Sequence, residues 1–377
     1  MPQINSWVEI SKSALIHNLK IFKKIIGPEV ALMPVIKSNA YGHGLPEVAR
    51  ICDGQPEVER LCTVNLAEAL FLRKNKIRKP ILVLSFYDLI EEDIGQAIRQ
   101  NITLAVYGQE QLDFLDKVAG RAKQKAKVQF KIDTGTSRLG IPVKRALDFI
   151  NKIFKKDHLQ LEGLFTHYAA AEEPEQSFAL KQTDDFYELI KKLEEKRIFL
   201  PLKHAACSAA ILMNNFYHFD AVRLGLSLYG LWSLENGSKI RKYLNLKPVL
   251  SWKTKIIQLK SLDPGDTVGY GRTHRVSRKT RLAVLPVGYW DGYDRKLSNF
   301  GQVLIKGRRC RVLGRVCMNL IMADVTGLSV KVGEEAVLIG RVGKEEITAD
   351  ELAEKLGTIN YEVVTRINPL LPRKIIK

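Results

Sequence analysis

Cysteine, acidic residues and long apolar runs are all scarce in this chain of 377 residues. Its five cysteines are odd in number and scattered, and no two are spaced as C-x-x-C. This pattern excludes a disulfide framework or a paired-cysteine zinc site and is typical of a reducing cytoplasm. No apolar run reaches the roughly 20 residues that cross a bilayer, and the first residues lack the basic and apolar blocks of a signal peptide. We therefore expect a cytoplasmic protein with no membrane partner.

Acidic residues are fewer than basic ones. The chain holds 59 Lys and Arg against 41 Asp and Glu, a formal net charge of +18. Such a charge permits an acidic or nucleic-acid partner. However, the basic residues are spread along the chain without the interleaved aromatic residues that stack bases. A solvated basic surface and no nucleic-acid partner are therefore expected, with RNA binding as the alternative.

Short apolar segments alternate with helical patterns through the first 230 residues. About eight such units, each with a nearly all-apolar strand, predict a (β/α)8 TIM-type barrel. An open doubly wound sheet is the alternative, because periodicity alone cannot show closure. The strands are expected to end near residues 36, 64, 85, 107, 132, 166, 206 and 224.

The pattern changes after Gly230, where glycine-punctuated β segments follow and only Thr348 to Leu356 has a clear helical pattern. We predict a barrel domain over residues 1–240 that binds a cofactor, and a mainly β domain over residues 241–377. The first few residues are a possible exception, since they could pack with the β domain instead.

Polar and charged residues gather at the ends of the predicted barrel strands, where such barrels place their working groups. Lys37 ends the first strand, and a lysine that is partly desolvated there would have a lowered pKa and a nucleophilic amine. A strand-end lysine that merely extends into solvent is the alternative. The later strand ends add Lys131, Asp133 and Arg138, then His167, then His204, Cys207 and Ser208, and finally Arg223 and Gly225.

A phosphate site is expected at the last two strand ends. Ser208 offers a hydroxyl, and Gly225-Leu226 offers backbone N–H groups. A nucleophilic lysine on the same rim as a phosphate site predicts pyridoxal 5'-phosphate, held by Lys37 as a Schiff base.

Ordered motifs along nearly the whole chain resemble those of the alanine racemase family. They are Val35 to Gly44, Lys131 to Gly135, Arg138-Leu139-Gly140, Leu164 to His167, Val222 to Gly225, Leu228-Tyr229-Gly230, Tyr270-Gly271-Arg272, Gly288-Tyr289, Asp291-Gly292-Tyr293, Gly314 to Met318 and Asn360-Tyr361-Glu362. The resemblance implies an isomerase that interconverts L-alanine and D-alanine and supplies D-alanine for peptidoglycan. It also implies a homodimer with shared active sites.

The resemblance implies two catalytic bases, Lys37 and Tyr270, on opposite faces of a planar carbanion, with Tyr270 donated by the partner subunit. A free tyrosine has a pKa of about 10, so a tyrosine base needs positive charge nearby, and His167 with Arg223 would supply it. Arg223 would face the cofactor's ring nitrogen, where related decarboxylases place a carboxylate. Because arginine keeps its proton, the ring nitrogen would stay unprotonated, which favours racemisation.

Other roles also follow from the matching positions. Lys131 corresponds to a lysine that is often carbamylated in the family, and carbamylation would remove its like-charge repulsion with Arg138. No metal is expected. The cofactor-binding set is Lys37, Tyr41, Arg138, His167, Ser208, Arg223, Gly225, Leu226 and Tyr361, and the substrate-binding set is Arg138, Met318 and Tyr289.

The chain departs from the family pattern at several positions. Cys207 and Asn319 replace the usual asparagine and aspartate, Thr136-Ser137 replaces Met-Gly, and Trp290 replaces an alanine. These departures bear on substrate breadth. A serine or broad-specificity amino-acid racemase and a non-enzymatic pyridoxal phosphate carrier therefore remain alternatives, although known single-domain carriers lack the β domain.

Overall fold

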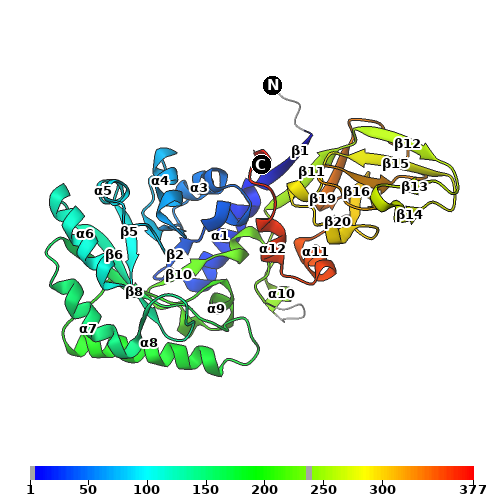
Figure 1. Ribbon diagram of the computed structural model, residues 1–377. Coiled ribbons are helices and arrows are strands. Elements are labelled where there is room, and N and C mark those ends of the chain that lie inside the picture. The colour runs from blue at the N-terminus through cyan, green and yellow to red at the C-terminus, as the bar shows by residue number, and fades with distance from the viewer. Residues whose placement is uncertain (1–4, 235–239) are drawn as a thin grey trace. The chain divides into compact units, whose positions relative to one another are not determined.

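The computed structural model describes residues 5–234 and 240–377 (Figure 1). The chain forms two compact units, which we call the barrel unit and the C-terminal unit. The barrel unit comprises residues 16–38 and 48–246, and the C-terminal unit comprises residues 5–15, 39–47 and 247–377. The short segment 39–47, which begins two residues after Lys37, is therefore part of the C-terminal unit.

Eight parallel strands form the barrel, in the order β2-β10-β9-β8-β6-β5-β4-β3. They are β2 (Ala31–Pro34), β3 (Leu61–Thr63), β4 (Ile81–Val83), β5 (Ile102–Val106), β6 (Ala126–Asp133), β8 (Leu159–Phe165), β9 (Leu202–His204) and β10 (Ala221–Leu224). Two parallel bridges, Leu32 to Val58 and Val35 to Cys62, join the segments around β2 and β3 and nearly close the ring. The predicted barrel is confirmed, and the open-sheet alternative is wrong.

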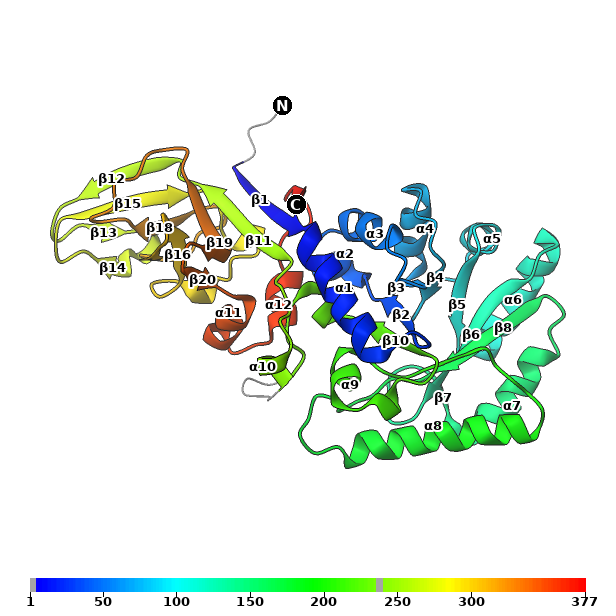
Figure 2. The same ribbon diagram turned by 180° about the vertical axis from the view of Figure 1, so that it is seen from behind.

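Helices cover the outside of these strands, as both ribbon views show (Figures 1 and 2). Asn65 caps α4 because its side chain accepts a hydrogen bond from the Glu68 N–H. Phe149 of α7 stacks on Phe130 of β6, with ring centroids 5.0 Å apart. The helices are α1 (Lys12–Ile26), α3 (Leu45–Asp53), α4 (Leu66–Lys74), α5 (Glu91–Arg99), α6 (Gln109–Ala122), α7 (Val143–Phe154), α8 (Ser177–Glu195) and α9 (Ser208–Met213). A short helix, α10 (Ile240–Tyr243), comes after the last barrel strand in the chain.

Strand β6 does not follow the all-apolar pattern expected of a barrel strand. Its apolar residues 126, 128, 130 and 132 alternate with polar or charged residues at 127, 129, 131 and 133. Successive side chains of a strand point to opposite faces. Since Phe130 packs on the helix layer, Gln129 and Lys131 share the other face, which is the barrel interior. The interior is therefore partly polar.

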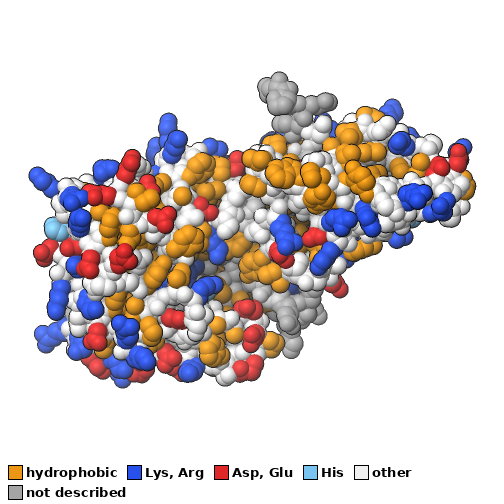
Figure 3. Space-filling view, in the orientation of Figure 1, with side chains coloured by type: hydrophobic (Ala, Val, Ile, Leu, Met, Phe, Trp, Pro, Cys, Tyr) orange, Lys and Arg blue, Asp and Glu red, His pale blue; other side chains and the backbone are white. Residues whose placement is uncertain are grey.

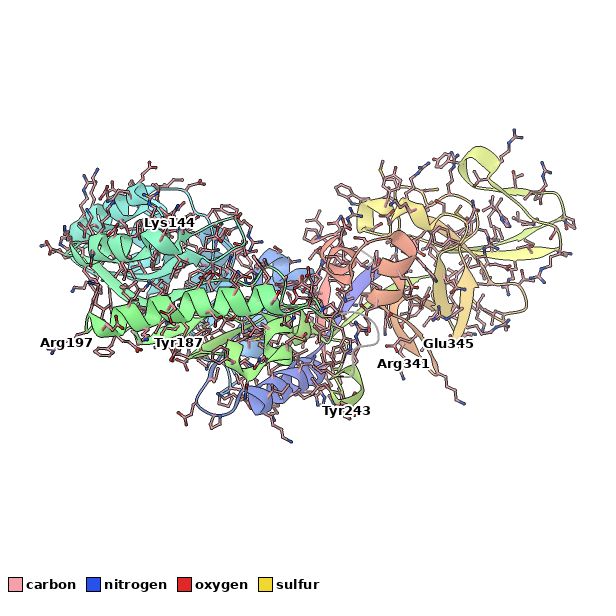
Figure 4. The ribbon with its side chains drawn as sticks, turned by 90° about the horizontal axis from the view of Figure 1, so that it is seen from below. Lys144, Tyr187, Arg197, Tyr243, Arg341 and Glu345 are labelled. Atoms are coloured by element: carbon pink, nitrogen blue, oxygen red, sulfur yellow. The ribbon has the colours of Figure 1, made fainter. Side chains whose placement is uncertain are left out.

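The C-terminal unit is mainly β, as predicted. Its largest sheet has the order β17-β16-β19-β11-β1-β21, with β20 paired to β19, and further sheets are β12-β15-β18 and β13-β14. The strands are β1 (Ser6–Ser11), β11 (Leu250–Lys255), β12 (Gln258–Leu262), β13 (Thr267–Val268), β14 (His274–Arg275), β15 (Thr280–Leu285), β16 (Gln302–Ile305), β17 (Arg308–Arg311), β18 (Ile321–Asp324), β19 (Glu335–Val342), β20 (Glu345–Ile347) and β21 (Arg373–Ile376). Figure 4 labels Arg341 and Glu345 on the β19–β20 hairpin.

Two helices lie between β20 and β21 in the chain. The first, α11 (Ala349–Leu356), was expected, and Thr348 caps it by accepting from the Glu351 N–H. The second, α12 (Asn360–Thr365), was not expected. It is only six residues long and contains two valines and a threonine, which have weak helix propensity. Its packing in the unit therefore decides its conformation.

No helix in the described part of the chain is both long and apolar enough to span a membrane. Within residues 5–234 and 240–377, no group of His, Cys, Asp and Glu side chains is placed to hold a metal ion. All five cysteines are free thiols.

Candidate active site

Lys37 follows β2 and opens the short turn α2 (Lys37–Tyr41). Burial lowers the pKa of Lys37, Arg138 and Arg223 lower it further, and Glu68 opposes them. A lysine with a lowered pKa holds a larger fraction of neutral, nucleophilic amine near neutral pH. The environment therefore suits the role that the sequence predicted for Lys37.

The turn after Lys37 is left-handed, which the sequence did not predict. Ser38, Asn39, Ala40 and Tyr41 have φ between 52° and 55°, and Gly42 has φ of 82°. Left-handed helical backbone costs L-residues about 1–2 kcal/mol each, so the surrounding contacts must hold this turn in place. One such contact is the hydrogen bond of 2.6 Å that the Ser38 N–H donates to Glu68 Oε1.

Arg223 is buried near the end of β10 and forms several hydrogen bonds. Its Nη2 donates to the carbonyls of Thr166 and Ala205, each at 2.7 Å, and to His167 Nδ1 at 3.1 Å. Its Nη1 donates to the His204 carbonyl and to His204 Nδ1. The hydrogen bonds of Arg223 to described residues thus use only the two terminal nitrogens, so its Nε–H is the donor left for a ligand.

No carboxylate in the described part of the chain forms an ion pair with this buried guanidinium. Burial lowers the pKa of His167 well below its usual value, and Arg223, Arg138, Lys131 and Lys37 lower it further. Because an arginine only donates, both histidines must turn an unprotonated Nδ1 toward Arg223. His167 and His204 are therefore neutral.

Lys131 of β6 lies in the same group of positive charges. Burial lowers the pKa of Lys131 to about 8, with contributions from Arg223, Arg138 and Lys37 that Asp133 partly offsets. Its ammonium donates to the Leu84 carbonyl at 3.2 Å and lies 5.4 Å from the centre of the Phe165 ring. A lysine with a lowered pKa has a larger fraction of neutral, reactive amine near neutral pH.

Asp133 orders the loop that leads to Arg138. Its Oδ1 accepts from the backbone N–H groups of Gly135 at 2.9 Å, Thr136 at 2.8 Å and Ser137 at 3.2 Å. Burial alone would raise the pKa of Asp133, but these hydrogen bonds outweigh burial and lower it. The substituted residues Thr136 and Ser137 thus fit this turn, and the Thr136 hydroxyl also donates to Asp133.

Ser208 lies against the loop after β10. Its hydroxyl oxygen accepts from the N–H groups of Gly225 at 3.0 Å and Ser227 at 3.3 Å. Both lone pairs of the oxygen are then engaged, so the hydroxyl hydrogen of Ser208 is left to donate outward. The predicted phosphate-binding residues Ser208 and Gly225 are therefore brought together.

These barrel residues fit an anionic cofactor such as pyridoxal 5'-phosphate. Arg138 and Arg223 lie close enough to Lys37 and Lys131 to lower the pKa of both lysines, and few acids offset them. Buried positive charge of this kind is stabilised by an anion. The site also contains two amines with a lowered pKa, Lys37 and Lys131, and one outward hydroxyl donor, Ser208. An aldehyde phosphate needs one such amine and such a donor.

Within the C-terminal unit, the structure brings Tyr41 and Tyr361 together. Their ring centroids are 6.1 Å apart, and Tyr361 lies on the unexpected helix α12. A Cβ at Gly42 would lie 2.0 Å from the Val364 carbonyl oxygen, so only glycine permits this approach of the turn to α12. The helix that the sequence did not reveal is thus the element that positions a predicted cofactor-binding residue.

Tyr289 and Met318 are also neighbours in the C-terminal unit. The Tyr289 N–H donates to the Cys317 carbonyl at 3.1 Å, and the Trp290 N–H donates to the Met318 carbonyl at 3.0 Å. Tyr289, Trp290 and Met318 are all exposed large side chains. The two predicted substrate-binding residues thus share one exposed patch, and Trp290 belongs to it.

Tyr270 begins a short 3-10 turn, Tyr270–Arg272, beside the β13–β14 pair. Its side chain is 73% exposed. The two glycines on either side of Tyr270, Gly269 and Gly271, both have positive φ. The Arg315 guanidinium lies 2.9 Å from the position that a Cβ of Gly271 would occupy. Arg315 therefore supports the turn that carries Tyr270.

Sequence reasoning assigned no role to His204 and did not notice Gln129. Both are fully buried, and His204 Nε2 lies 2.7 Å from Gln129 Oε1. The alternation of polar residues along β6 is the signal that could have identified Gln129, because it places Gln129 on the same face as Lys131.

Family models cover almost the whole chain. The N-terminal domain of alanine racemase matches residues 10–233, and the C-terminal domain matches residues 249–375. The chain is 39% identical over 370 residues to the alanine racemase of Halothermothrix orenii, covering 98% of this chain and 96% of that protein. It is also 39% identical over 369 residues to the alanine racemase of Methanococcus maripaludis, covering 97% of each.

Solved structures agree with these matches. The alanine racemase of Clostridium difficile 630 superposes with a TM-score of 0.93 at 33% identity, covering 100% of this chain and 97% of that one. The alanine racemase of Bacillus anthracis with bound L-Ala-P gives a TM-score of 0.90 at 35% identity, covering 100% and 96%. The chain therefore belongs to the alanine racemase family of pyridoxal-phosphate-dependent isomerases.

Proposed function

We propose that this protein interconverts L-alanine and D-alanine by a two-base mechanism with pyridoxal 5'-phosphate as its cofactor. The observation that supports this most strongly is the pairing of two groups at one end of the barrel. Lys37 has a pKa lowered by burial, and Arg223 is a buried guanidinium whose terminal nitrogens are both engaged. The first suits a nucleophile and base, and the second suits a fixed donor to a ring nitrogen.

Different residues would bind different parts of the cofactor and the substrate. Ser208, with Gly225 and Leu226, would hold the phosphate, and Tyr41 and Tyr361 of the C-terminal unit would add hydroxyl groups to it. Arg138 would contact the ring oxygen and the substrate carboxylate. Lys131 would orient Arg138, and its pKa of about 8 supports carbamylation because a neutral amine is the reactive form.

When bound, pyridoxal 5'-phosphate supplies the electron sink that makes the Cα proton of an attached amino acid acidic. The chain then needs two bases. Lys37 takes or returns a proton at one face of Cα, and Tyr270 does the same at the other, so one proton leaves and another arrives without any redox change. Arg223 only donates, so it leaves the ring nitrogen unprotonated and weakens that sink, which limits side reactions.

The exposure of Tyr270, Tyr289 and Met318 supports a homodimer in which each site uses residues from two chains. A base for Cα must be shielded from water to act efficiently, and a second copy of the chain would provide the cover. Mixing tests this directly. Lys37→Ala and Tyr270→Phe should each be inactive, whereas their mixture after dissociation and reassociation should regain about a quarter of wild-type activity, because half of the randomly formed dimers carry one intact site.

The primary experiment follows the circular dichroism of L-alanine incubated with the purified protein and cofactor. Loss of optical activity, with no net consumption of alanine, is expected. Comparing kcat/KM for alanine, serine and larger amino acids tests the alternative of a broad-specificity racemase, which Asn319 and Trp290 keep open. A protein that binds the cofactor but leaves every amino acid unchanged would overturn the enzymatic proposal in favour of a carrier.

For its cellular role, we propose the supply of D-alanine for peptidoglycan in the cytoplasm. The five free thiols support a reducing compartment, since none is paired in a disulfide. Deletion of the gene should make growth depend on added D-alanine. Growth without it, in a strain with no second racemase, would contradict this role.

A further inference from the structure

A line of buried polar groups continues from Arg223 into the barrel. Arg223 Nη1 donates to His204 Nδ1, and His204 Nε2 lies 2.7 Å from Gln129 Oε1. His204 and Gln129 are fully buried, and Arg223 is 4% exposed. The three residues come from β10, β9 and β6, so the line crosses the interior of the barrel.

The positions of donors and acceptors along this line are constrained at both ends, by Arg223 and by Gln129. Arginine keeps all its protons, so His204 Nδ1 must offer a lone pair to it. The hydrogen of the neutral imidazole is then on Nε2, and only an acceptor can face that nitrogen. Gln129 must therefore present its oxygen to His204, which also settles the orientation of its amide.

In the described part of the chain, Gln129 is the sole hydrogen-bond partner of His204 Nε2. The Phe165 ring stacks on the imidazole with centroids 4.9 Å apart and planes 6° apart. Arg223 and Arg60 are the charged groups that act on it. Burial lowers the pKa of His204 well below its usual value, and both arginines lower it further, so the imidazole stays neutral.

Hydrogen bonds compensate only part of the burial of the Gln129 amide. Its Nε2 is buried and has no hydrogen-bond partner among the described residues. A buried polar group without a partner destabilises the fold, and an apolar side chain of the same length would avoid this loss. Among residues 5–234 and 240–377, the Gln129 side chain forms a hydrogen bond to His204 alone, so this bond is what the amide contributes.

We propose that Gln129 is a positioning residue that holds His204 in its neutral Nε2–H form, so that His204 Nδ1 fixes Arg223 at the end of the barrel. This inference rests on the proposed function only in that Arg223 is the group that faces the cofactor. In the other tautomer, an Nδ1–H would face the Nη1–H of Arg223, and two donors cannot bond. Arg223 would then shift, and small displacements of a reacting or contacting group cost activity.

The experiment uses the full-length protein loaded with pyridoxal 5'-phosphate and labelled with 15N in its imidazole rings. Long-range proton–nitrogen NMR spectra distinguish a protonated ring nitrogen from an unprotonated one, and the His204 signals are assigned by their loss in His204→Asn. Gln129→Met removes the acceptor at similar length, and Gln129→Glu keeps an acceptor oxygen. Thr103→Val is the matched control, because Thr103 is a buried polar residue of the same barrel that bonds to Glu162 and Arg60, not to His204.

In the wild type, His204 should carry its hydrogen on Nε2. Gln129→Met should give a mixture of tautomers and lower kcat about tenfold with little change in KM, since the substrate contacts remain. Gln129→Glu and Thr103→Val should both keep the hydrogen on Nε2.

The proposal is overturned if wild-type His204 carries its hydrogen on Nδ1, or if Gln129→Met is folded and keeps both the wild-type tautomer and kcat. It is also overturned if Thr103→Val changes the tautomer as much as Gln129→Met, because the effect would then be a general loosening of the barrel. The tautomer is read without any turnover. A protein that fails to racemise alanine but shows these spectra would contradict the proposed function and leave this inference standing.

Discussion

The predicted site residues of the two units differ in how far they are buried. At the barrel end, Arg223, Lys131 and Ser208 are buried, and each forms hydrogen bonds within the barrel unit. The Lys and Arg side chains visible in Figure 3 are, by contrast, those at the surface. In the C-terminal unit, Tyr270 is 73% exposed and Met318 is 55% exposed. The barrel half is therefore organised within one chain. The other half consists of residues whose backbone is fixed but whose side chains have no cover in one chain, as expected of groups that act at an interface.

The largest expected effect comes from removing the Lys37 amine in the barrel unit. Lys37→Ala removes the amine that would bind the cofactor and serve as a base, so racemisation should fall by about 10³-fold or more. Circular dichroism of L-alanine measures the rate, and the visible absorbance of the bound cofactor should disappear with it. The matched control is Lys203→Ala, a barrel-strand lysine paired with Asp220 at 2.9 Å, which should keep full activity. A Lys37→Ala protein within tenfold of wild type would refute the assignment.

The next prediction tests the exposed half. Tyr270→Phe removes one of two proton transfers, and the loss of a general base costs about 10²- to 10⁴-fold. The useful readout is exchange of the Cα hydrogen with deuterated solvent, which should persist for one alanine enantiomer and vanish for the other. Equal exchange of both enantiomers would refute the two-base proposal. Tyr187→Phe, an exposed tyrosine on α8 that Figure 4 labels, is the control.

A third prediction concerns the free-energy cost of keeping Lys131 charged in the folded barrel unit. Lys131 has a folded-state pKa of about 8, below the value of about 10.4 for lysine in an unfolded chain. Between these values the unfolded chain binds more protons, so the free energy of unfolding should rise with pH, and below pH 8 the folded state should bear the full cost of about 3 kcal/mol. The difference in unfolding free energy between Lys131→Met and wild type should therefore shrink by that amount from pH 7 to above pH 10.

Urea unfolding at several pH values provides this measurement, in buffers free of carbon dioxide so that the lysine stays unmodified. Lys203→Met is a suitable control for the pH dependence, because its ammonium is paired with Asp220. Parallel pH profiles for wild type and Lys131→Met would contradict the prediction.

The smallest expected effect concerns the exposed patch. Trp290 stands where the family pattern has alanine and is held beside Met318 by its backbone hydrogen bond. Trp290→Ala should widen the approach to the substrate and raise kcat/KM for serine relative to alanine by about threefold. Trp290→Phe keeps most of the bulk and should change the ratio less. An unchanged ratio in both variants would place Trp290 away from the substrate path.

The order of barrel elements was predictable because it depends on local patterns. Each buried parallel strand is a short apolar run. Ser11 and Asn65 are residues of a type that caps helices, and in the structure both side chains accept from a backbone N–H three residues on. The strand ends then place polar residues on one rim without any knowledge of packing.

Other features could not be read from local patterns. The left-handed turn at residues 38–41 uses non-glycine residues against their own preference, so only contacts such as Ser38 with Glu68 reveal it. The helix α12 has weak propensity, and its place follows from the close approach of Val364 to Gly42.

The sequence by itself determined the (β/α)8 barrel, the mainly β second part and the strand-end residues, because strand period, helix caps and motif spacing are properties of neighbouring residues. The tertiary structure decided which polar groups meet inside the barrel. Arg223, His204 and Gln129 lie on three strands far apart in the chain, and the protons on their nitrogens are set by one another. Hydrogen-bond direction depends on contact between distant segments, so no local pattern can encode it.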